Sequence, residues 1–191
     1  MAKEHDIVTY INNQLKTVFS AKRFQAGKLS GIAELITDEE EETKPGIVDN
    51  YGDVVYCGID DTNPFQVYHR VIQPEAEWDF ENDFGKLRNV KETTNMLMVV
   101  IGDRNRLKLT AEDIKTGIVA ALPLELPVSE LNSLGLKTAN IIPGTFNWDK
   151  AEVYRYEYNI EETALKTNTI MFSFSYQIET VIDQSCFTLC E

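Results

Sequence analysis

The chain has 191 residues, of which 43% are hydrophobic and 26% are charged, as in an ordinary globular domain. It carries 31 acidic and 18 basic residues, and its formal net charge of -13 produces a surface that repels nucleic-acid phosphates and anionic membranes. Composition therefore disfavours tight duplex binding and membrane-surface binding, while an acidic surface is compatible with a channel through which DNA slides without sticking.

The N-terminal part of the chain predicts one amphipathic helix and one short strand. Apolar residues recur at spacings of three and four over residues 7–19, which places them on one helical face, and Asp6 is a suitable N-cap. A short strand is expected over residues 32–36. The five consecutive acids at 38–42 repel one another, so we expect a solvent-exposed connection there with no specific metal site.

The next segment predicts two paired strands and then an irregular insertion. Residues 54–59 and 65–72 are rich in β-forming residues, and the sequence Asp-Asp-Thr-Asn-Pro at 60–64 is typical of a turn between them. Residues 73–94 have no clear period, and their aromatic residues alternate with acids. We expect this segment to be an irregular insertion, longer than the usual connection, that offers a contact surface.

The centre of the chain predicts a buried strand, a basic cluster and a second helix. The apolar run at 96–101 is far too short for a membrane helix and predicts a strand buried on both faces at the centre of a sheet. The basic cluster is expected on the solvent face of a strand or turn and consists of Arg104, Arg106 and Lys108. Thr110 and Asp113 have the spacing of a capping box, which predicts a helix over residues 111–122 that Pro123 ends.

The last third of the chain predicts mainly β-structure. Residues 129–134 suit one helical turn, Pro143-Gly144 suits a turn, and the alternating tyrosines of residues 153–158 predict a strand. Apolar and polar residues alternate most regularly over residues 170–182, a strand about 43 Å long at ~3.3 Å per residue. Because typical strands are much shorter, we expect part of this one to project past its sheet, with unpaired edges that another subunit covers.

The sequence contains no short motif for catalysis, phosphate binding or metal binding. Glycine-rich phosphate loops, the GxSxG elbow and the HExxH zinc motif are all missing. The three cysteines, Cys57, Cys186 and Cys190, lack metal-ligand spacing and are expected to be reduced thiols. His69 is expected to be a strand histidine that faces a cross-strand partner. We therefore expect no enzyme, no cofactor and no metal, although the many acids leave a two-carboxylate hydrolase open.

The order of these elements resembles the small α+β proteins of phage necks and tails, among them tail terminators and head–tail joining proteins. The resemblance is one of layout and carries over no functional residue. It implies a structural virion protein that forms a homo-oligomeric ring with an acidic lumen for DNA. The ring would contact other neck or tail proteins of the virion. Such a protein is made in the host cytoplasm, and the first ten residues show no signal-peptide core. A bacterial protein-interaction module and an enzyme without short motifs stay open as alternatives.

We therefore predict one α+β domain over residues 1–191, with a mostly antiparallel sheet, two main helices packed on one face and the irregular insertion at about 73–94. Aromatic residues of the insertion and of the last strand are the predicted interface: Trp78, Phe80, Phe84, Phe172, Phe174 and Tyr176.

Overall fold

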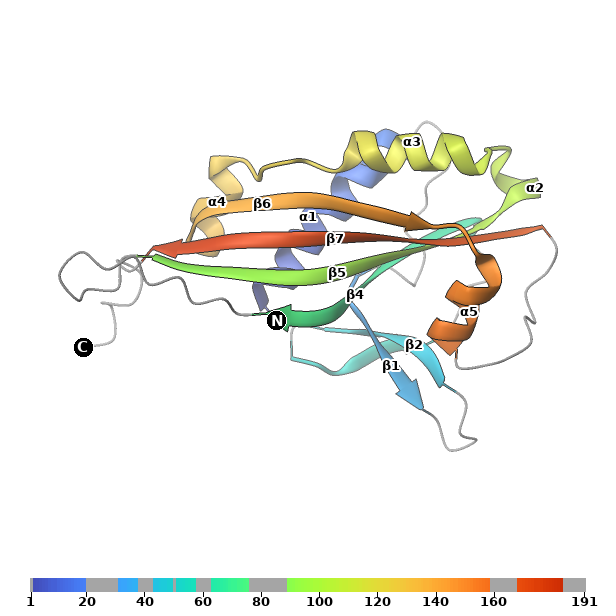
Figure 1. Ribbon diagram of the computed structural model, residues 1–191, viewed down its shortest axis with the longest axis horizontal. Helices are drawn as coiled ribbons and strands as arrows, with labels where there is room; N and C mark the ends of the chain where they lie inside the picture. The colour runs from blue at the N-terminus through green and yellow to red at the C-terminus, as the bar shows by residue number, and fades with distance from the viewer. Residues whose placement is uncertain are drawn as a thin grey trace.

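The computed structural model describes residues 2–19, 31–37, 43–49, 51–57, 63–75, 89–158 and 168–183 (Figure 1). The helices are α1 (Ala2–Phe19), α2 (Arg104–Leu107), α3 (Ala111–Ala121), α4 (Val128–Leu134) and α5 (Lys150–Tyr158). The strands are β1 (Ala33–Thr37), β2 (Thr43–Val48), β3 (Val54–Cys57), β4 (Phe65–Glu75), β5 (Asn89–Asp103), β6 (Leu136–Asn147) and β7 (Thr169–Asp183). The predicted α+β class is confirmed.

The strands form two antiparallel sheets. The larger sheet has the order β4-β5-β7-β6, and the smaller has the order β1-β2-β3. β5 and β7 pair along their whole length, from Asn89 opposite Asp183 to Asp103 opposite Thr169. The apolar run in β5 is buried as predicted except at Leu97, which is partly buried, because β5 lies between β4 and β7 and packs into both cores.

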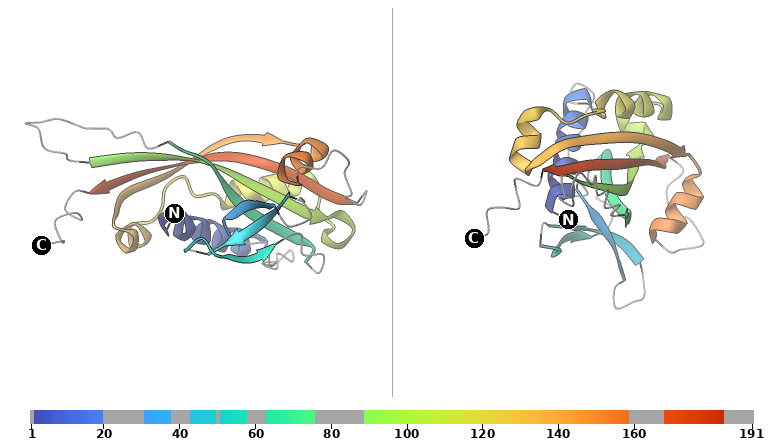
Figure 2. Two further views of the ribbon diagram at one scale, coloured as in Figure 1. Left: turned by 90° about the horizontal axis from the view of Figure 1, so that it is seen from below. Right: turned by 60° about the vertical axis from the view of Figure 1, so that its left-hand side comes forward.

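Helices α1 and α3 contact each other and cover one face of the larger sheet, as predicted (Figures 1 and 2). Their apolar stripes pack on the inward residues of the strands, and Phe172 and Phe174 of β7 are at the centre of this main core. A smaller core on the other face joins α5 and the smaller sheet to the strands, through residues that include Ala33, Ile47, Tyr68, Val153 and Tyr158. Only part of that second face is covered by these elements.

The capping box predicted for α3 is confirmed. Thr110 accepts a hydrogen bond from the backbone N–H of Asp113, and the Asp113 carboxylate accepts one from the backbone N–H of Thr110. We expect Thr110→Ala to reduce the free energy of unfolding by about 1 kcal/mol, because it removes the hydroxyl that accepts a hydrogen bond from the Asp113 N–H at the start of the helix. Urea denaturation measures this loss. Thr17→Ala, which removes an exposed hydroxyl that donates to the Asn13 carbonyl within α1, is the control and should change stability less.

The strand predicted over residues 153–158 is wrong, since these residues belong to α5. The Asp149 carboxylate accepts hydrogen bonds from the N–H groups of Ala151 and Glu152 and begins the helix. Tyr154 and Tyr158 stack with ring centroids 4.7 Å apart, one helical turn from each other, and Tyr156 is exposed. The tyrosines have a period of two in the sequence, but burial follows the helical period.

Several sequence-predicted connections are also corrected. β3 pairs with β2, so the predicted pairing of residues 54–59 with residues 65–72 is wrong. The predicted irregular insertion is shorter, because residues 73–75 and 89–94 belong to β4 and β5; residues 76–88 lie outside the described part of the chain. The Pro143-Gly144 turn is a register shift within β6, and Arg104 and Arg106 belong to the short helix α2.

The long last strand is confirmed, but its predicted unpaired half is wrong. β7 pairs with β5 on one side from end to end and with β6 on the other side over most of its length. Phe172, Phe174 and Tyr176 are therefore corrected from interface to core residues, because α1 and α3 cover that face and leave each of them no more than 1% exposed. Trp78, Phe80, Phe84 and the acidic run at 38–42 lie outside the described residues.

Candidate functional site: an open groove on the larger sheet

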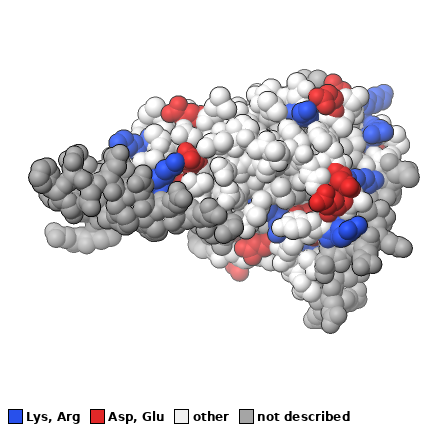
Figure 3. All heavy atoms as spheres, viewed as in Figure 1, with Lys and Arg blue, Asp and Glu red and all other residues white. Residues whose placement is uncertain are grey.

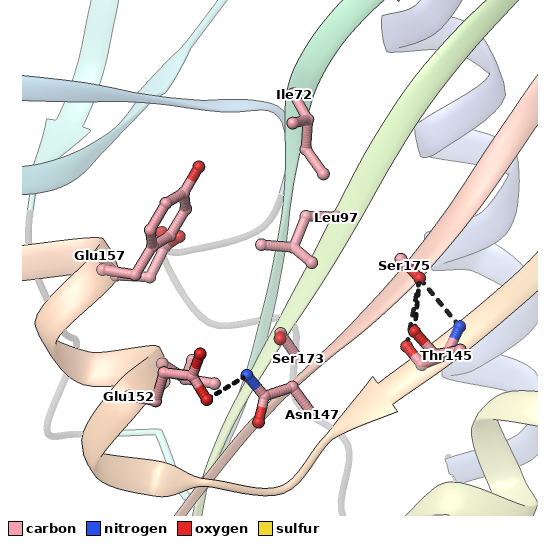
Figure 4. A pocket seen from close by; sticks show the side chains of 10 residues that line it. Ile72, Leu97, Thr145, Asn147, Glu152, Glu157, Ser173 and Ser175 are labelled. Atoms are coloured by element: carbon pink, nitrogen blue, oxygen red, sulfur yellow. Dashed lines mark hydrogen bonds between the residues drawn. The ribbon is translucent and has the colours of Figure 1, made fainter.

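The face of the larger sheet opposite α1 and α3 is hollowed in two adjoining places that together we term the sheet groove, and Figure 4 shows the first of them. The first hollow, of about 270 Å³, lies against α5 and its lining includes Leu97, Ser173 and Tyr156. The second hollow, of about 430 Å³, includes Asn95, Ile142 and Gln177. Ile72 and Ser175 line both hollows, so the two adjoin.

The alternation of β7 explains why the groove floor is polar but uncharged. Side chains alternate between the two faces of a strand, so the phenylalanines of β7 enter the main core while Ser173, Ser175 and Gln177 face the groove. The neighbouring strands add apolar side chains: Ile72 is 47% exposed and Ile142 is 39% exposed. The result is a mixed surface of aliphatic, hydroxyl and amide groups.

Among the described residues, charged side chains are sparse in the middle of the face that Figure 3 shows. The two acidic residues among the groove lining are Glu152 and Glu157, and both have partners. Glu152 accepts a hydrogen bond from the side-chain amide of Asn147 at 3.1 Å. Although the chain has a net charge of -13, the described residues that line the groove therefore carry little charge to repel a second acidic surface.

The floor of the groove is held rigidly where β6 bulges. The Ser175 hydroxyl accepts a hydrogen bond from the backbone N–H of Thr145 at 2.8 Å, as Figure 4 shows. A Cβ atom at Gly144 would lie 2.4 Å from the Ser175 Oγ and 2.6 Å from its carbonyl oxygen. Glycine is therefore required at this position, because β6 and β7 approach too closely there for any side chain.

A buried ionic cluster fixes α5, which forms one wall of the groove. The Glu157 carboxylate accepts hydrogen bonds from the Tyr68 hydroxyl at 2.8 Å and from the Arg70 guanidinium at 2.7 Å, and it is fully buried. Burial raises the pKa of Glu157, while the Arg70 charge and the two hydrogen bonds oppose that rise. Both carboxylate oxygens are engaged, and the cluster ties α5 to β4.

The second buried polar cluster lies on the other side of the sheet, below α1. His69 Nδ1 lies 2.8 Å from the Tyr176 hydroxyl and its Nε2 lies 3.1 Å from Asn12 Oδ1. These contacts are satisfied when Nε2 donates to Asn12 and Nδ1 accepts from Tyr176. Burial lowers the pKa of His69 to about 3. The prediction of a strand histidine with a partner from another strand is confirmed, since Tyr176 belongs to β7.

Sequence reasoning missed the groove as a site. Its polar strand face was visible in the alternation at residues 173, 175 and 177, but the wall formed by α5 was hidden by the incorrect strand prediction. Within the described ranges, no three His, Cys, Asp or Glu residues lie close enough to hold a metal ion, and no helix is both long and apolar enough to cross a membrane. Cys186 and Cys190 lie outside those ranges.

No protein-family model matches the sequence, and no curated protein sequence matches it significantly. Functional inference therefore depends on the chemistry and geometry of the chain itself.

Proposed function

We propose that the protein is a structural subunit that assembles with copies of itself, in the manner of a ring-forming head–tail connector or tail terminator of a tailed phage. The observation that supports this proposal is the sheet groove, an open and nearly uncharged depression on a strongly acidic chain. Its partners in this proposal are other copies and neighbouring neck or tail proteins of the virion. It needs no cofactor, and DNA passes through the ring without tight binding.

Electrostatics supports self-association through this particular face. Two copies that each carry a net charge of -13 repel each other wherever acidic residues meet, and this repulsion favours contact through a face with few charges. Ile72 and Ile142 are partly exposed in that face, and covering such side chains favours association by roughly 25 cal/mol per Å² of apolar surface. The acidic residues elsewhere then suit a lumen that repels the DNA backbone.

The structure leads us to expect that Ile72→Asp or Ile142→Asp weakens self-association about tenfold or more. Either carboxylate would be desolvated in a contact that lacks a cationic partner, while in the free chain it stays in water. Light scattering after size-exclusion chromatography, over a range of concentrations, measures the effect. Val119→Asp is the matched control, because Val119 is an exposed residue of α3 on the opposite side of the sheet.

A wild-type chain that stays monomeric at high concentration would contradict the proposal. So would loss of assembly in the Val119 variant to the same extent as in the groove variants, since the effect would then reflect added charge rather than the groove.

A further inference from the structure

The first hollow of the sheet groove contains a buried hydroxyl group that is not used within the described part of the chain. Ser173 of β7 lines this hollow and is 5% exposed, yet its hydroxyl makes no hydrogen bond to any residue that the structure describes. By contrast, the hydroxyl of Ser175, the next residue on the same face of β7, accepts a hydrogen bond from the N–H of Thr145. Because a buried hydroxyl without a partner costs free energy, Ser173 is placed to bond a group that enters the hollow.

A carboxylate without a counter-charge lies on the same wall of the hollow. Asn147 of β6 is opposite Ser173 in the sheet, and its amide donates to Glu152 Oε2 at 3.1 Å, so three polar side chains gather there (Figure 4). Among the described residues, Glu152 has no cationic partner and its Oε1 accepts no hydrogen bond. Glu157, the other acidic residue of the lining, is paired with Arg70. The wall therefore offers unused acceptor oxygens and one negative charge.

The rest of the lining is largely apolar. Leu97 is partly buried, Ile72 is 47% exposed, and the exposed ring of Tyr156 lies at the side of α5. The volume of about 270 Å³ is just below the roughly 300–1,000 Å³ of typical ligand pockets. The hollow thus suits a small molecule that has an apolar body and a hydrogen-bond donor at one end.

We infer that the first hollow binds the primary ammonium group of a small organic cation with an aliphatic stem. An ammonium group carries three N–H donors and no acceptor, which suits the acceptor oxygens of Glu152 and Ser173. The stem would lie on Leu97 and Ile72, as lysine stems lie along apolar surface. The Glu152 carboxylate and the net charge of -13 both disfavour an anion at this place.

Two kinds of molecule carry such a group, namely a free alkylamine and a protein with an exposed lysine side chain. The experiment below distinguishes them. The inference goes beyond the proposed function and does not depend on it, because the residues that would hold the ammonium group all belong to one copy.

Titration of the isotope-labelled protein with n-hexylammonium chloride tests the inference, with the backbone amide NMR signals of Asn147, Glu152 and Ser173 as the readout. We expect saturable shifts in the millimolar range, as for so small a ligand. n-Hexanol, which has the same stem without the charge, should bind about tenfold more weakly, and hexanoate should not bind. Nα-acetyl-lysine N-methylamide separates the sources: binding equal to that of hexylammonium identifies a lysine side chain, and binding of hexylammonium alone identifies a free amine.

Two variants locate the ammonium group. Glu152→Gln should weaken hexylammonium binding about tenfold or more, because it removes the charge but keeps an oxygen that can accept from Asn147. Ser173→Ala should weaken it about threefold. Glu125→Gln is the matched control, because Glu125 is also an exposed acid but lies in the connection between α3 and α4, and it should bind hexylammonium like wild type.

Three results would overturn the inference. These are the absence of binding by both amines, which would leave Ser173 hydrated only, equal binding of hexanol and hexylammonium, and equal losses in the Glu152 and Glu125 variants. Repeating the titration with the Ile142→Asp variant, whose change lies in the second hollow, keeps the outcome independent of self-association. A monomeric wild-type chain that binds hexylammonium as expected would contradict the proposed function and leave this inference intact.

Discussion

Replacing Arg70 by methionine is expected to lower the free energy of unfolding by about 3 to 5 kcal/mol at neutral pH. Methionine retains much of the aliphatic volume of arginine, but within the described residues it leaves the fully buried Glu157 carboxylate with the Tyr68 hydroxyl as its remaining hydrogen-bond partner. An unpaired buried carboxylate is costly because it has lost its hydration without gaining a counter-charge. Urea denaturation at pH 7 measures the loss, provided that unfolding is two-state.

The pH dependence of the Arg70→Met variant separates this mechanism from a packing defect. Burial raises the pKa of Glu157, and removal of the Arg70 charge raises it further. A carboxyl whose folded-state pKa is raised contributes stability below its unfolded pKa and loses it as the pH rises through the folded pKa. The variant should therefore be less impaired at pH 5 than at pH 8, and Arg70→Met combined with Glu157→Gln should recover part of the loss.

A surface ion pair provides the control for that experiment. Lys91 lies 2.9 Å from Glu179, but both side chains are partly exposed, so Lys91→Met should cost less than about 1 kcal/mol and show little dependence on pH. Equal losses in the Arg70 and Lys91 variants would show that Glu157 is not held by its buried charge partner.

Acidification is expected to destabilise the wild-type protein through His69. Burial lowers the pKa of His69 to about 3, whereas an unfolded histidine titrates near 6.5. The unfolded state therefore binds a proton that the folded state does not, and stability falls as the pH drops below 6.5, by up to about 1.4 kcal/mol per pH unit. The loss attributable to His69 reaches roughly 2.5 kcal/mol at pH 4.5.

Comparison with His69→Gln isolates that contribution from the carboxylates, which titrate in the same region. Glutamine is neutral at every pH, so the variant should lose less stability than wild type between pH 6.5 and 4.5, even if it starts from a lower value. His5→Gln is the comparison, because burial and the N-terminal charge lower the pKa of His5 while the charges of Asp6, Glu4 and Asp49 oppose that lowering, so this variant should change the pH dependence less than His69→Gln. An unchanged pH dependence in His69→Gln would contradict the assignment.

The sequence correctly predicted the elements that depend on residues close together in the chain. The capping box at Thr110 and the alternation of β7 each depend on residues a few positions apart, and both are confirmed. The aromatic residues of β7 were predicted to be at an interface because strand length suggests exposure. They are core residues because α1, which lies far away in the sequence, covers them.

The groove could not be predicted in the same way, because its parts come together only in the folded chain. Leu97, Ser175 and Thr145 belong to three strands whose order in the sheet differs from their order in the sequence. The Glu157 cluster could not be predicted from the sequence either, because Arg70 and Glu157 are 87 positions apart. The alternating tyrosines around Glu157 also favour a strand where the chain forms a helix. The pairing of β3 with β2 was not predicted either, because the separation of two strands in the sequence does not specify which strands pair in the sheet.

The position of β7 has a consequence for how the protein is made on the ribosome. β7 follows all its neighbours in the sequence, yet it lies between β5 and β6. Until residues 169–183 have been synthesised, β5 and β6 have no strand between them, and the apolar side chains of the main core lack Phe172 and Phe174. Most of the long-range pairing then forms in one late step. Ser173 and Ser175 of the groove floor arrive in the same step. A prematurely terminated chain that lacks β7 would therefore have neither a closed core nor the floor of the sheet groove.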